Sequence, residues 1–204
     1  MFITFEGLDG CGKTTQATLL VERLKNVGRE VVFLREPGGT IVSEKIRDIL
    51  LDQKHLELRQ KAELLLFSSA RAQLVDEVIC PALRAGKFVV CDRFSDSTTA
   101  YQGYGRGLDL DEIKSVNMIA SSGTMPELTV LVDVELEEIV RRRRAAGVVS
   151  DRMESSGAEF YRRVRQGYRA IAAEEPNRIV IVNGMRRVEV IHHEVWSIVQ
   201  QRMS

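Results

Sequence analysis

The sequence predicts an α/β fold, in which a five-stranded parallel sheet carries helices on both faces. Short apolar runs alternate with longer amphipathic stretches along all 204 residues. The runs are apolar on both faces, which is typical of buried parallel strands. The stretches between them are long enough for the helical crossovers that parallel strands need. Neither an internal repeat nor a low-complexity linker interrupts this pattern, so we expect a single domain over residues 1–204.

The predicted elements follow one another in regular alternation. The strands are Met1–Glu6, Glu30–Arg35, Lys87–Asp92, Leu128–Asp133 and Arg178–Val182. The helices are Thr15–Leu24, Ile41–Leu51, Leu58–Arg84, Asp109–Ser121, Leu136–Ala146, Ala158–Ala173 and Val188–Gln201. The longest of these helices should break or kink near Pro81, because proline cannot donate to the helical ladder.

Composition excludes several classes of protein. Twenty-nine basic residues balance 29 acidic ones, so no net charge favours binding to nucleic acid or to a membrane. No apolar run approaches the roughly 20 residues that span a bilayer. The first predicted strand begins at residue 1, which predicts that there is no secretory signal. The three cysteines, Cys11, Cys80 and Cys91, are odd in number and lack metal-ligand spacing, which predicts a reduced, cytoplasmic protein.

Residues 7–14 match the phosphate-loop pattern Gly-x4-Gly-Lys-Ser/Thr, and a tight structural turn is the alternative interpretation. The loop reads Gly7, Leu8, Asp9, Gly10, Cys11, Gly12, Lys13, Thr14. Because a strand precedes it and a helix follows, backbone N–H groups and a helix N-terminus should surround an anion. Lys13 would be the mobile cation, and Thr14 would give its hydroxyl to Mg2+. This context predicts the fold of P-loop NTPases and nucleotide kinases.

Two residues of the loop lead to separate hypotheses. The carboxylate of Asp9 is unfavourable beside a triphosphate, so it should turn away, toward an arginine, a metal-bound water or a hydroxyl of a second substrate. The thiol of Cys11 lies at a helix N-terminus beside Lys13, which could lower its pKa and open it to oxidation.

Charged residues follow the predicted strands, whose carboxyl ends share the ligand-binding edge of such a sheet. Asp92 is the leading candidate to hold Mg2+, through the water shell of the ion. Asp133 is a second candidate, or else the cap of the following helix.

Two arginines could hold a second, acceptor phosphate. Arg93 follows the third strand directly, and Arg47 lies on the helix after a Pro-Gly-Gly turn. Arginine binds phosphate through a planar fork that fixes its orientation. Arg47 could equally be an exposed partner of Glu44 or Asp48 on its own helix.

Four consecutive arginines, residues 141–144, precede Gly147 and a polar stretch. Such a run is usually a solvated helix face. Four in sequence nevertheless surround most of a helix, so at least one must point inward. We therefore predict a short mobile lid, about residues 142–156, which brings cations to the transferred phosphoryl group.

With these motifs assembled, the chain closely resembles the bacterial thymidylate kinases over nearly its whole length. The matching segments are Gly7–Thr14, Arg35–Thr40, Phe67–Arg71, Asp92–Phe94 and Ala100–Gly103. The second and the last are far more specific than the phosphate loop. The resemblance implies transfer of the γ-phosphate of ATP to dTMP with Mg2+, which gives dTDP.

The resemblance also implies roles for single residues. Asp9 would meet the 3′-hydroxyl of the deoxyribose, and Arg47 and Arg93 would hold the dTMP phosphate. Phe67 would stack on thymine, although its sequence context alone predicts a core residue, and Arg71 would donate to the base edge. The implied dTMP-binding set is Asp9, Glu36, Arg47, Phe67, Arg71, Arg93, Thr98, Tyr101 and Gln102.

Three members of this set lie close together in sequence. Thr98 and Gln102 would add polar contacts to the base. Tyr101 would fill the space that a ribose 2′-hydroxyl needs, which favours deoxynucleotides.

Members of this family carry the catalytic arginine either inside the phosphate loop, where this chain has Gly10, or on the lid. Bacterial relatives often have a basic residue where this chain has Ala146, so the lid arginine is left open among Arg142, Arg144 and Arg152. The implied catalytic residues are Lys13, Asp92, Arg93, Arg144 and Arg152. The family is usually a homodimer through its long helices.

Three other functions are weighed against this one. The first is a kinase for a different small acceptor, such as another nucleoside monophosphate. The second is a nucleotide-binding regulatory module without turnover, which the presence of Lys13, Thr14, Asp92 and Arg93 opposes. The third, a GTP-binding switch, would need an Asn-Lys-x-Asp motif, and none of the four asparagines is followed by lysine.

Overall fold

The computed structural model describes residues 1–147 and 157–203. Within them, five parallel strands form one sheet in the order β2-β3-β1-β4-β5. The strands are β1 (Phe2–Glu6), β2 (Val31–Arg35), β3 (Phe88–Asp92), β4 (Leu128–Asp133) and β5 (Ile179–Asn183). The predicted five-stranded parallel α/β fold is confirmed.

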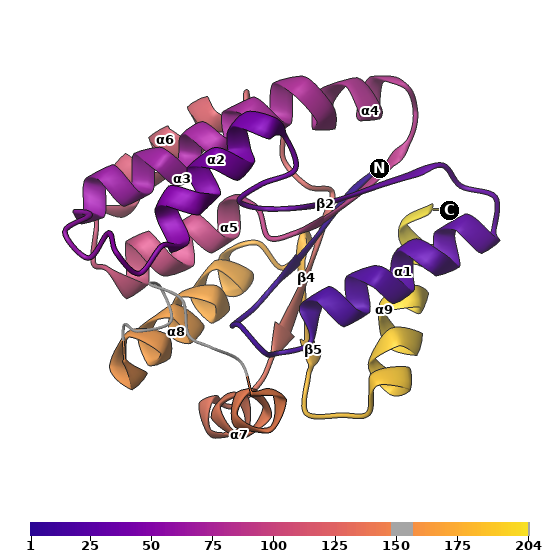
Figure 1. The fold of residues 1–204 in the computed structure, drawn as a ribbon. Coiled ribbons are helices and arrows are strands. Elements are labelled where there is room, and N and C mark those ends of the chain that lie inside the picture. Colours follow the sequence, from indigo (N-terminus) through magenta and orange to yellow (C-terminus); the bar gives the residue numbers. More distant parts are fainter. Residues whose placement is uncertain (148–156, 204) are drawn as a thin grey trace.

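Helices cover both faces of the sheet (Figure 1). They are α1 (Lys13–Asn26), α2 (Ile41–Leu51), α3 (Gln60–Leu74), η1 (Val75–Ile79), α4 (Cys80–Arg84), α5 (Ser95–Thr98), η2 (Thr99–Gly105), α6 (Leu110–Ala120), α7 (Leu136–Ala146), α8 (Ala158–Glu174) and α9 (Val188–Met203). Helices α1 and α9 lie on one side of the sheet, and α3, α5 and α8 lie on the other. No helix in the described ranges is long and apolar enough to cross a membrane.

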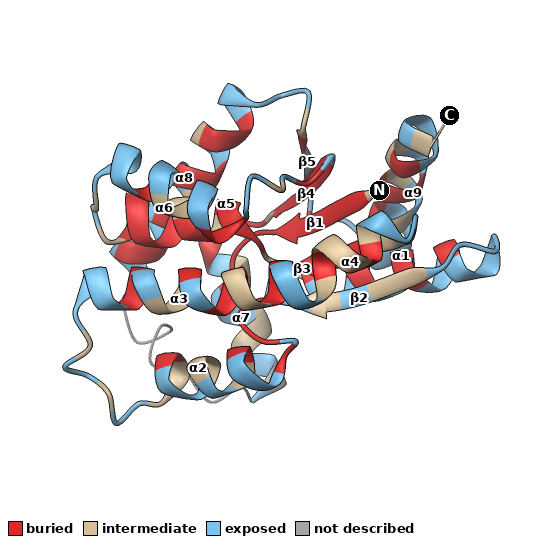
Figure 2. Cartoon of the chain, turned by 90° about the horizontal axis from the view of Figure 1, so that it is seen from above, coloured by how far each residue is buried: buried red, intermediate tan, exposed pale blue. Residues whose placement is uncertain are grey.

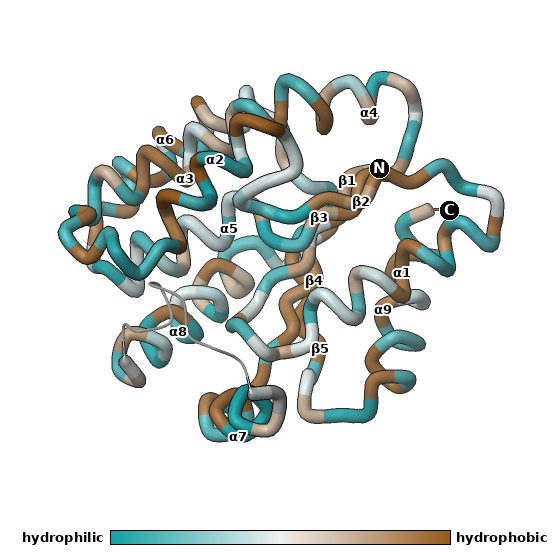
Figure 3. The backbone as a smooth tube through the Cα atoms, in the orientation of Figure 1, coloured by the Kyte–Doolittle hydropathy of each residue, from teal (hydrophilic) through white to brown (hydrophobic). Residues whose placement is uncertain are grey.

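The core lies between the three central strands and the helices that cover them. Strands β1, β3 and β4 are almost entirely buried (Figure 2), and the same strands form the most hydrophobic part of the backbone trace (Figure 3). The outer strands β2 and β5 keep some apolar side chains exposed, among them Phe33 and Ile181. The phosphate loop follows β1, the strand at the centre of the sheet. The carboxyl ends of the neighbouring parallel strands β3 and β4 therefore lie beside the loop.

The predicted long helix over residues 58–84 is irregular, as expected near Pro81. It begins at Gln60, widens into the π-helical segment η1 and resumes as the short helix α4. Pro81 is the second residue of α4, and the π-helical segment η1 ends at Ile79, just before it. The break therefore falls before the proline rather than at it.

Residues 95–105 form a helical segment that the sequence pattern does not predict. Glycines such as Gly103 and Gly105 disfavour helix, so the local pattern indicates a loop. Tertiary packing requires both. A Cβ on Gly105 would lie 2.6 Å from the ring of Phe160 on α8, and one on Gly103 would lie 2.6 Å from Leu110 on α6. Tertiary contact thus overrides local propensity here.

The predicted lid, about residues 142–156, extends past the end of α7. Its residues 148–156, which include Arg152, lie outside the described residues. The part that is described consists of the last turns of α7, with residues 142–146, and of Gly147, where that helix ends.

Candidate functional site

The phosphate loop joins β1 to α1 in a backbone conformation that only glycine adopts freely. Gly10 and Gly12 have φ of 89° and 98°, and Gly12 stands at the N-terminus of α1 with no side-chain cap. The first N–H groups of that helix consequently remain available to an anion. Lys13, the first residue of α1, is buried.

Asp9 turns toward an arginine, as its charge predicts. Its Oδ1 accepts from Nη2 of Arg93 at 2.6 Å and from Nζ of Lys13 at 3.3 Å, while Tyr101 donates its hydroxyl to Oδ2 at 3.1 Å. Burial alone would raise the pKa of Asp9, but the charges of Arg93 and Lys13 outweigh it and hold that pKa well below its usual range. One carboxylate therefore joins the phosphate-loop lysine to the arginine that follows β3.

Arg93 occupies an unusual backbone position, with φ of 75°. A left-handed conformation is costly for a residue with a Cβ and persists only where its surroundings impose it. Here the N–H of Arg93 donates to the carbonyl of Phe5 at 2.9 Å. Its guanidinium lies over the ring of Tyr101, with Cζ 5.0 Å from the centroid. The strained backbone thus points a largely buried arginine at the phosphate loop.

Thr14 and Asp92, the two candidate metal ligands, lie in contact, since the Thr14 hydroxyl donates to Oδ2 of Asp92. The other oxygen of Asp92 is buried and has no hydrogen-bond partner in the described part of the chain. A buried carboxylate oxygen without a donor is suited to a cation or to its water shell. These two residues fit a Mg2+ ion.

Asp133 was considered as a Mg2+ ligand and as the cap of the following helix, and its contacts support neither role. It forms ion pairs with Arg165 at 2.7 Å and Arg169 at 2.6 Å, both on α8. Burial would raise the pKa of Asp133, but the hydrogen bonds and charges of the two arginines outweigh it and lower that pKa. The residue that precedes α7 is Glu135, so Asp133 does not cap that helix either.

A cavity opens beside Asp9 and Arg93, and every residue of the predicted dTMP-binding set lines it. The lining residues are Asp9, Glu36, Pro37, Arg47, Leu51, Phe67, Arg71, Arg93, Phe94, Ser97, Thr98, Tyr101 and Gln102. They come from segments as distant in sequence as the phosphate loop and α3. Phe67 is half-buried, with part of its ring against the main core and part at the cavity.

Arg71 lines this cavity and is almost wholly buried. Its Nε donates to Glu36 at 2.9 Å, and its two terminal nitrogens donate to Thr98 and Asn117, each at 2.9 Å. Burial raises the pKa of Glu36, and the charge of Arg71 opposes that rise. Thr98 therefore contacts Arg71, whereas the resemblance implies a contact from Thr98 to the base. Gln102 likewise donates to Glu63 at 3.0 Å.

Sequence reasoning missed Glu63 and Asn117. A usable signal was present for Glu63, because Glu63, Phe67 and Arg71 are spaced four residues apart and share one face of α3. Asn117 carries no comparable signal, since a lone asparagine on α6 is most often a surface residue.

Arg47 points into the same region from α2. Its Nη1 donates to the carbonyl of Pro37 at 3.0 Å. Glu44, a partner considered for it, instead pairs with Arg35 at 2.9 Å and accepts the N–H of Gly39 at 2.7 Å. The side chain of Arg47 is half-buried at the cavity wall.

The arginine run wraps around α7, so its members face different ways. Arg141 is exposed and pairs with Glu138, whereas Arg142 donates to the carbonyls of Cys11 at 3.2 Å and Gly184 at 2.9 Å. Arg143 packs over the phosphate loop, since a Cβ on Gly10 would lie 3.2 Å from its Cγ.

Arg144 is exposed and lines a second cavity with Arg143 and Asp9. The run is thus neither wholly a solvated face nor wholly directed inward.

The hypothesis of a reactive Cys11 is wrong. The thiol is 2% exposed, and burial raises its pKa above the ordinary value despite the nearby charge of Lys13. A Cβ on Gly7 would lie 2.9 Å from its sulfur, so the thiol fills the space under the loop. Cys11 is a core residue.

A parallel sheet with this phosphate loop, a carboxylate beside its threonine and an arginine-lined cavity next to it define a P-loop phosphotransferase. The family model for thymidylate kinase matches residues 5–195. The chain belongs to the thymidylate kinase family.

Individual relatives are similar over nearly their whole length. The chain is 48% identical to the thymidylate kinase of Caldanaerobacter subterraneus subsp. tengcongensis, over 98% of this chain and 95% of that protein. It is 50% identical to the thymidylate kinase of Pelotomaculum thermopropionicum, over 95% and 90% of the two chains. The crystal structure of thymidylate kinase from Ehrlichia chaffeensis superposes with a TM-score of 0.81 at 38% identity and covers 98% of both chains.

Proposed function

We propose that this chain is a dTMP kinase, which transfers the γ-phosphate of ATP to dTMP and yields ADP and dTDP for nucleotide biosynthesis. Membership of the thymidylate kinase family supports the assignment. The observation that carries it is the bridge Lys13–Asp9–Arg93, because it joins a phosphate loop to a cavity that can hold an acceptor.

The donor half of the site is the phosphate loop, residues 7–14, which binds ATP. Its backbone N–H groups and Lys13 hold the β- and γ-phosphates. Thr14 and Asp92 would hold Mg2+, directly or through its waters, and a bound Mg2+ would supply positive charge to the phosphates.

The acceptor half begins at Arg93 and Arg47, which hold the dTMP phosphate in line with the donor. Asp9 accepts the 3′-hydroxyl of the sugar, and Tyr101 occupies the space of a 2′-hydroxyl. Both residues already touch Arg93, so one cluster orients phosphate and sugar together.

Thymine lies deeper in the cavity, between Phe67 and the polar groups around Arg71. Three N–H groups of Arg71 are already donated to Glu36, Thr98 and Asn117, which fix the guanidinium plane. The remaining N–H groups can donate to a carbonyl on the base edge. Thr98 and Gln102 hold the pocket in shape through Arg71 and Glu63 and so act on the base indirectly.

Transfer needs no covalent enzyme intermediate, since positioning and charge neutralisation carry most of the chemistry. Lys13 and Arg93 supply fixed cations. A further cation comes from the lid, residues 142–156, and of its described arginines Arg144 has the most exposed position near Asp9. We assign the same role to Arg152, which lies outside the described residues.

We further propose a homodimer through the long helices and a location in the cytoplasm. Large apolar side chains lie exposed on α3 and α6, including Leu65 at 56% and Ile119 at 78%, beside a groove between these helices. Light scattering after size exclusion should give twice the chain mass, and Ile119→Glu should give a monomer. A wild-type monomer would overturn the dimer. All three cysteines are free thiols, which suits a reducing compartment.

The activity is tested with a panel of acceptors. The purified chain, ATP and Mg2+ are incubated with dTMP, dUMP, UMP, CMP and AMP, and ADP release is measured. We expect dTMP to give the highest kcat/KM, with dUMP next because it lacks only the 5-methyl group. A higher value for any ribonucleotide would refute the assignment to dTMP.

A further inference from the structure

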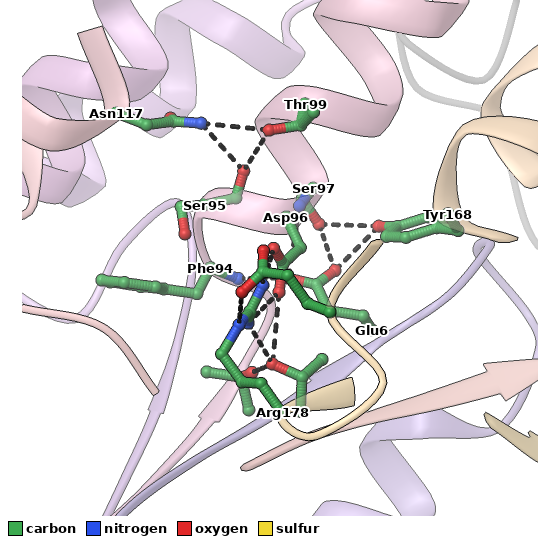
Figure 4. A network of polar contacts seen from close by, with 12 residues as sticks. Glu6, Phe94, Ser95, Asp96, Ser97, Thr99, Asn117, Tyr168 and Arg178 are labelled. Atoms are coloured by element: carbon green, nitrogen blue, oxygen red, sulfur yellow. Dashed lines mark hydrogen bonds and ion pairs between the residues drawn. The ribbon is translucent and has the colours of Figure 1, made fainter. Parts of the chain in front are cut away.

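Glu6, the last residue of β1, is a buried carboxylate to which the function above assigns no role. Its Oε1 accepts the backbone N–H groups of Phe94 at 2.7 Å and Ser97 at 3.3 Å. Its Oε2 accepts the hydroxyls of Ser97 at 2.6 Å and Tyr168 at 2.8 Å. Figure 4 shows Glu6, at the end of β1, between these groups, which come from Phe94, from α5 and from α8.

The same two hydroxyls face Arg93. Nη1 of Arg93 donates to Oγ of Ser97 and to the hydroxyl oxygen of Tyr168, each at 3.0 Å. The two hydroxyl oxygens also lie 2.9 Å from each other. When both hydroxyls donate to Glu6, their lone pairs are left for the guanidinium. Glu6 therefore determines which way the two hydroxyls point, and the hydroxyls hold one side of Arg93.

Glu6 also fixes the backbone that carries Arg93. The segment α5 begins after Phe94, whose side chain has no oxygen to cap a helix. The carboxylate of Glu6 takes the place of a cap by accepting the N–H groups of Phe94 and Ser97. These contacts hold the turn in which Arg93 has its left-handed φ of 75°.

We propose that Glu6, Ser97 and Tyr168 form a positioning unit that holds Arg93 in the orientation needed for the acceptor phosphate. The unit acts through Arg93. Of its three members only Ser97 also lines the acceptor cavity. It rests on the proposed function, in which Arg93 binds the dTMP phosphate. Since Tyr168 lies on α8, the unit also ties that helix to the acceptor site.

The charges around Glu6 are consistent with this role. Burial, and then the negative charge of Asp96, raise the pKa of Glu6 to about 7, while Arg93 opposes the rise. Asp96 is itself paired with Arg178 at 2.7 Å. A buried carboxyl with so raised a pKa is costly to keep, which favours a functional reason for it. Above pH 7 it is ionised and can accept all four donors.

The unit is tested by binding two ligands that differ only in the phosphate. Calorimetry at pH 8 compares dTMP with thymidine for the wild type, Tyr168→Phe and Ser97→Ala. Each variant removes one hydroxyl, and we expect about a tenfold loss of dTMP affinity with thymidine affinity unchanged. The matched control is Tyr104→Phe, because Tyr104 packs on Gly167 of α8 and lies outside the unit.

Equal losses for dTMP and thymidine would show a merely structural role and overturn the proposal, as would unchanged dTMP affinity in both variants. A double variant separates the proposal from the function on which it rests. In the Arg93→Ala background, Tyr168→Phe should cause no further loss of dTMP affinity, and an undiminished loss would refute action through Arg93.

If Arg93→Ala itself leaves the preference for dTMP over thymidine unchanged, the proposed phosphate site is wrong. If Arg93→Ala abolishes that preference while Tyr168→Phe and Ser97→Ala both leave it intact, only the positioning unit is wrong.

Discussion

Oδ1 of Asp9 lies 2.6 Å from Nη2 of Arg93, and the same oxygen lies 3.3 Å from Nζ of Lys13. A carboxylate of the protein thus lies between two cations. In the proposed reaction each incoming phosphate competes with Asp9 for one of these cations, and the carboxylate is then left to accept the sugar hydroxyl. We propose that this cluster orders the site before substrate arrives.

Asp9→Asn should selectively weaken recognition of the sugar. The wild type should prefer dTMP over its 3′-deoxy analogue by about tenfold in kcat/KM, because a hydrogen bond to the charged Asp9 is lost with the hydroxyl. Asparagine is a weaker acceptor, so the variant should lose most of this preference. Initial rates with the two acceptors measure it. A variant that discriminates as well as the wild type would separate Asp9 from the 3′-hydroxyl.

Arg71→Ala should destabilise the fold as well as weaken base binding. It leaves the carboxylate of Glu36 buried without its partner, which costs about 3–5 kcal/mol. Adding Glu36→Gln should recover part of that loss, because the buried charge is then gone. Urea unfolding of the single and double variants measures the free energy lost in Arg71→Ala and the part that Glu36→Gln recovers. Equal stabilities for the two would mean that the ion pair is not the cause.

The patterns that predicted the fold were local, and the features that they missed depend on distant contacts. Short apolar runs predicted every strand to within a residue or two, because a strand that is buried on both faces of a parallel sheet is apolar almost throughout. The helical segment 95–105 was not predicted, because its glycines are required by distant contacts: Gly105 packs against Phe160 on α8 and Gly103 against Leu110 on α6.

In the candidate site, too, residues in local motifs were predicted and residues that depend on distant contacts were missed. Lys13, Arg93 and Arg71 lie in sequence motifs that indicate their roles. Glu6 and Tyr168 lie in an apolar strand and an amphipathic helix, where one polar residue carries no signal until the fold brings them within 2.8 Å of each other. Cys11 was misjudged because sequence shows its charged neighbours and not its burial.

The lid arginines should differ in their effects. Arg144→Ala should lower kcat by at least tenfold, because a cation delivered to the transferred phosphoryl group stabilises the transition state. Arg141→Ala is the matched control, since Arg141 lies on the same helix, is exposed and pairs with Glu138. Steady-state kinetics with saturating ATP and dTMP distinguish them. Equal kcat values for the two variants would remove Arg144 from the mechanism.

Glu6 should make stability depend on pH in the neutral range. Its pKa rises from 4.5 to about 7 on folding, so the folded chain holds the proton more tightly. The free energy of unfolding should then fall as the pH rises from about 4.5 to about 7, by roughly 2–3 kcal/mol, and Glu6 should cause no further change above that. Glu6→Gln should lack this slope. Denaturant titrations at pH 5 and pH 8 compare the two, and parallel curves would contradict the raised pKa.

The central claim is that Lys13 and Arg93 serve the two phosphates of one transfer reaction. It is tested most directly by kcat for ATP and dTMP in Lys13→Ala and Arg93→Ala, with Lys25→Ala as a control on the same helix α1 as Lys13. Circular dichroism confirms that each variant is folded. We expect turnover to fall by orders of magnitude in the first two and to stay at the wild-type level in the control. Near-wild-type turnover in folded Lys13→Ala or Arg93→Ala would contradict the account.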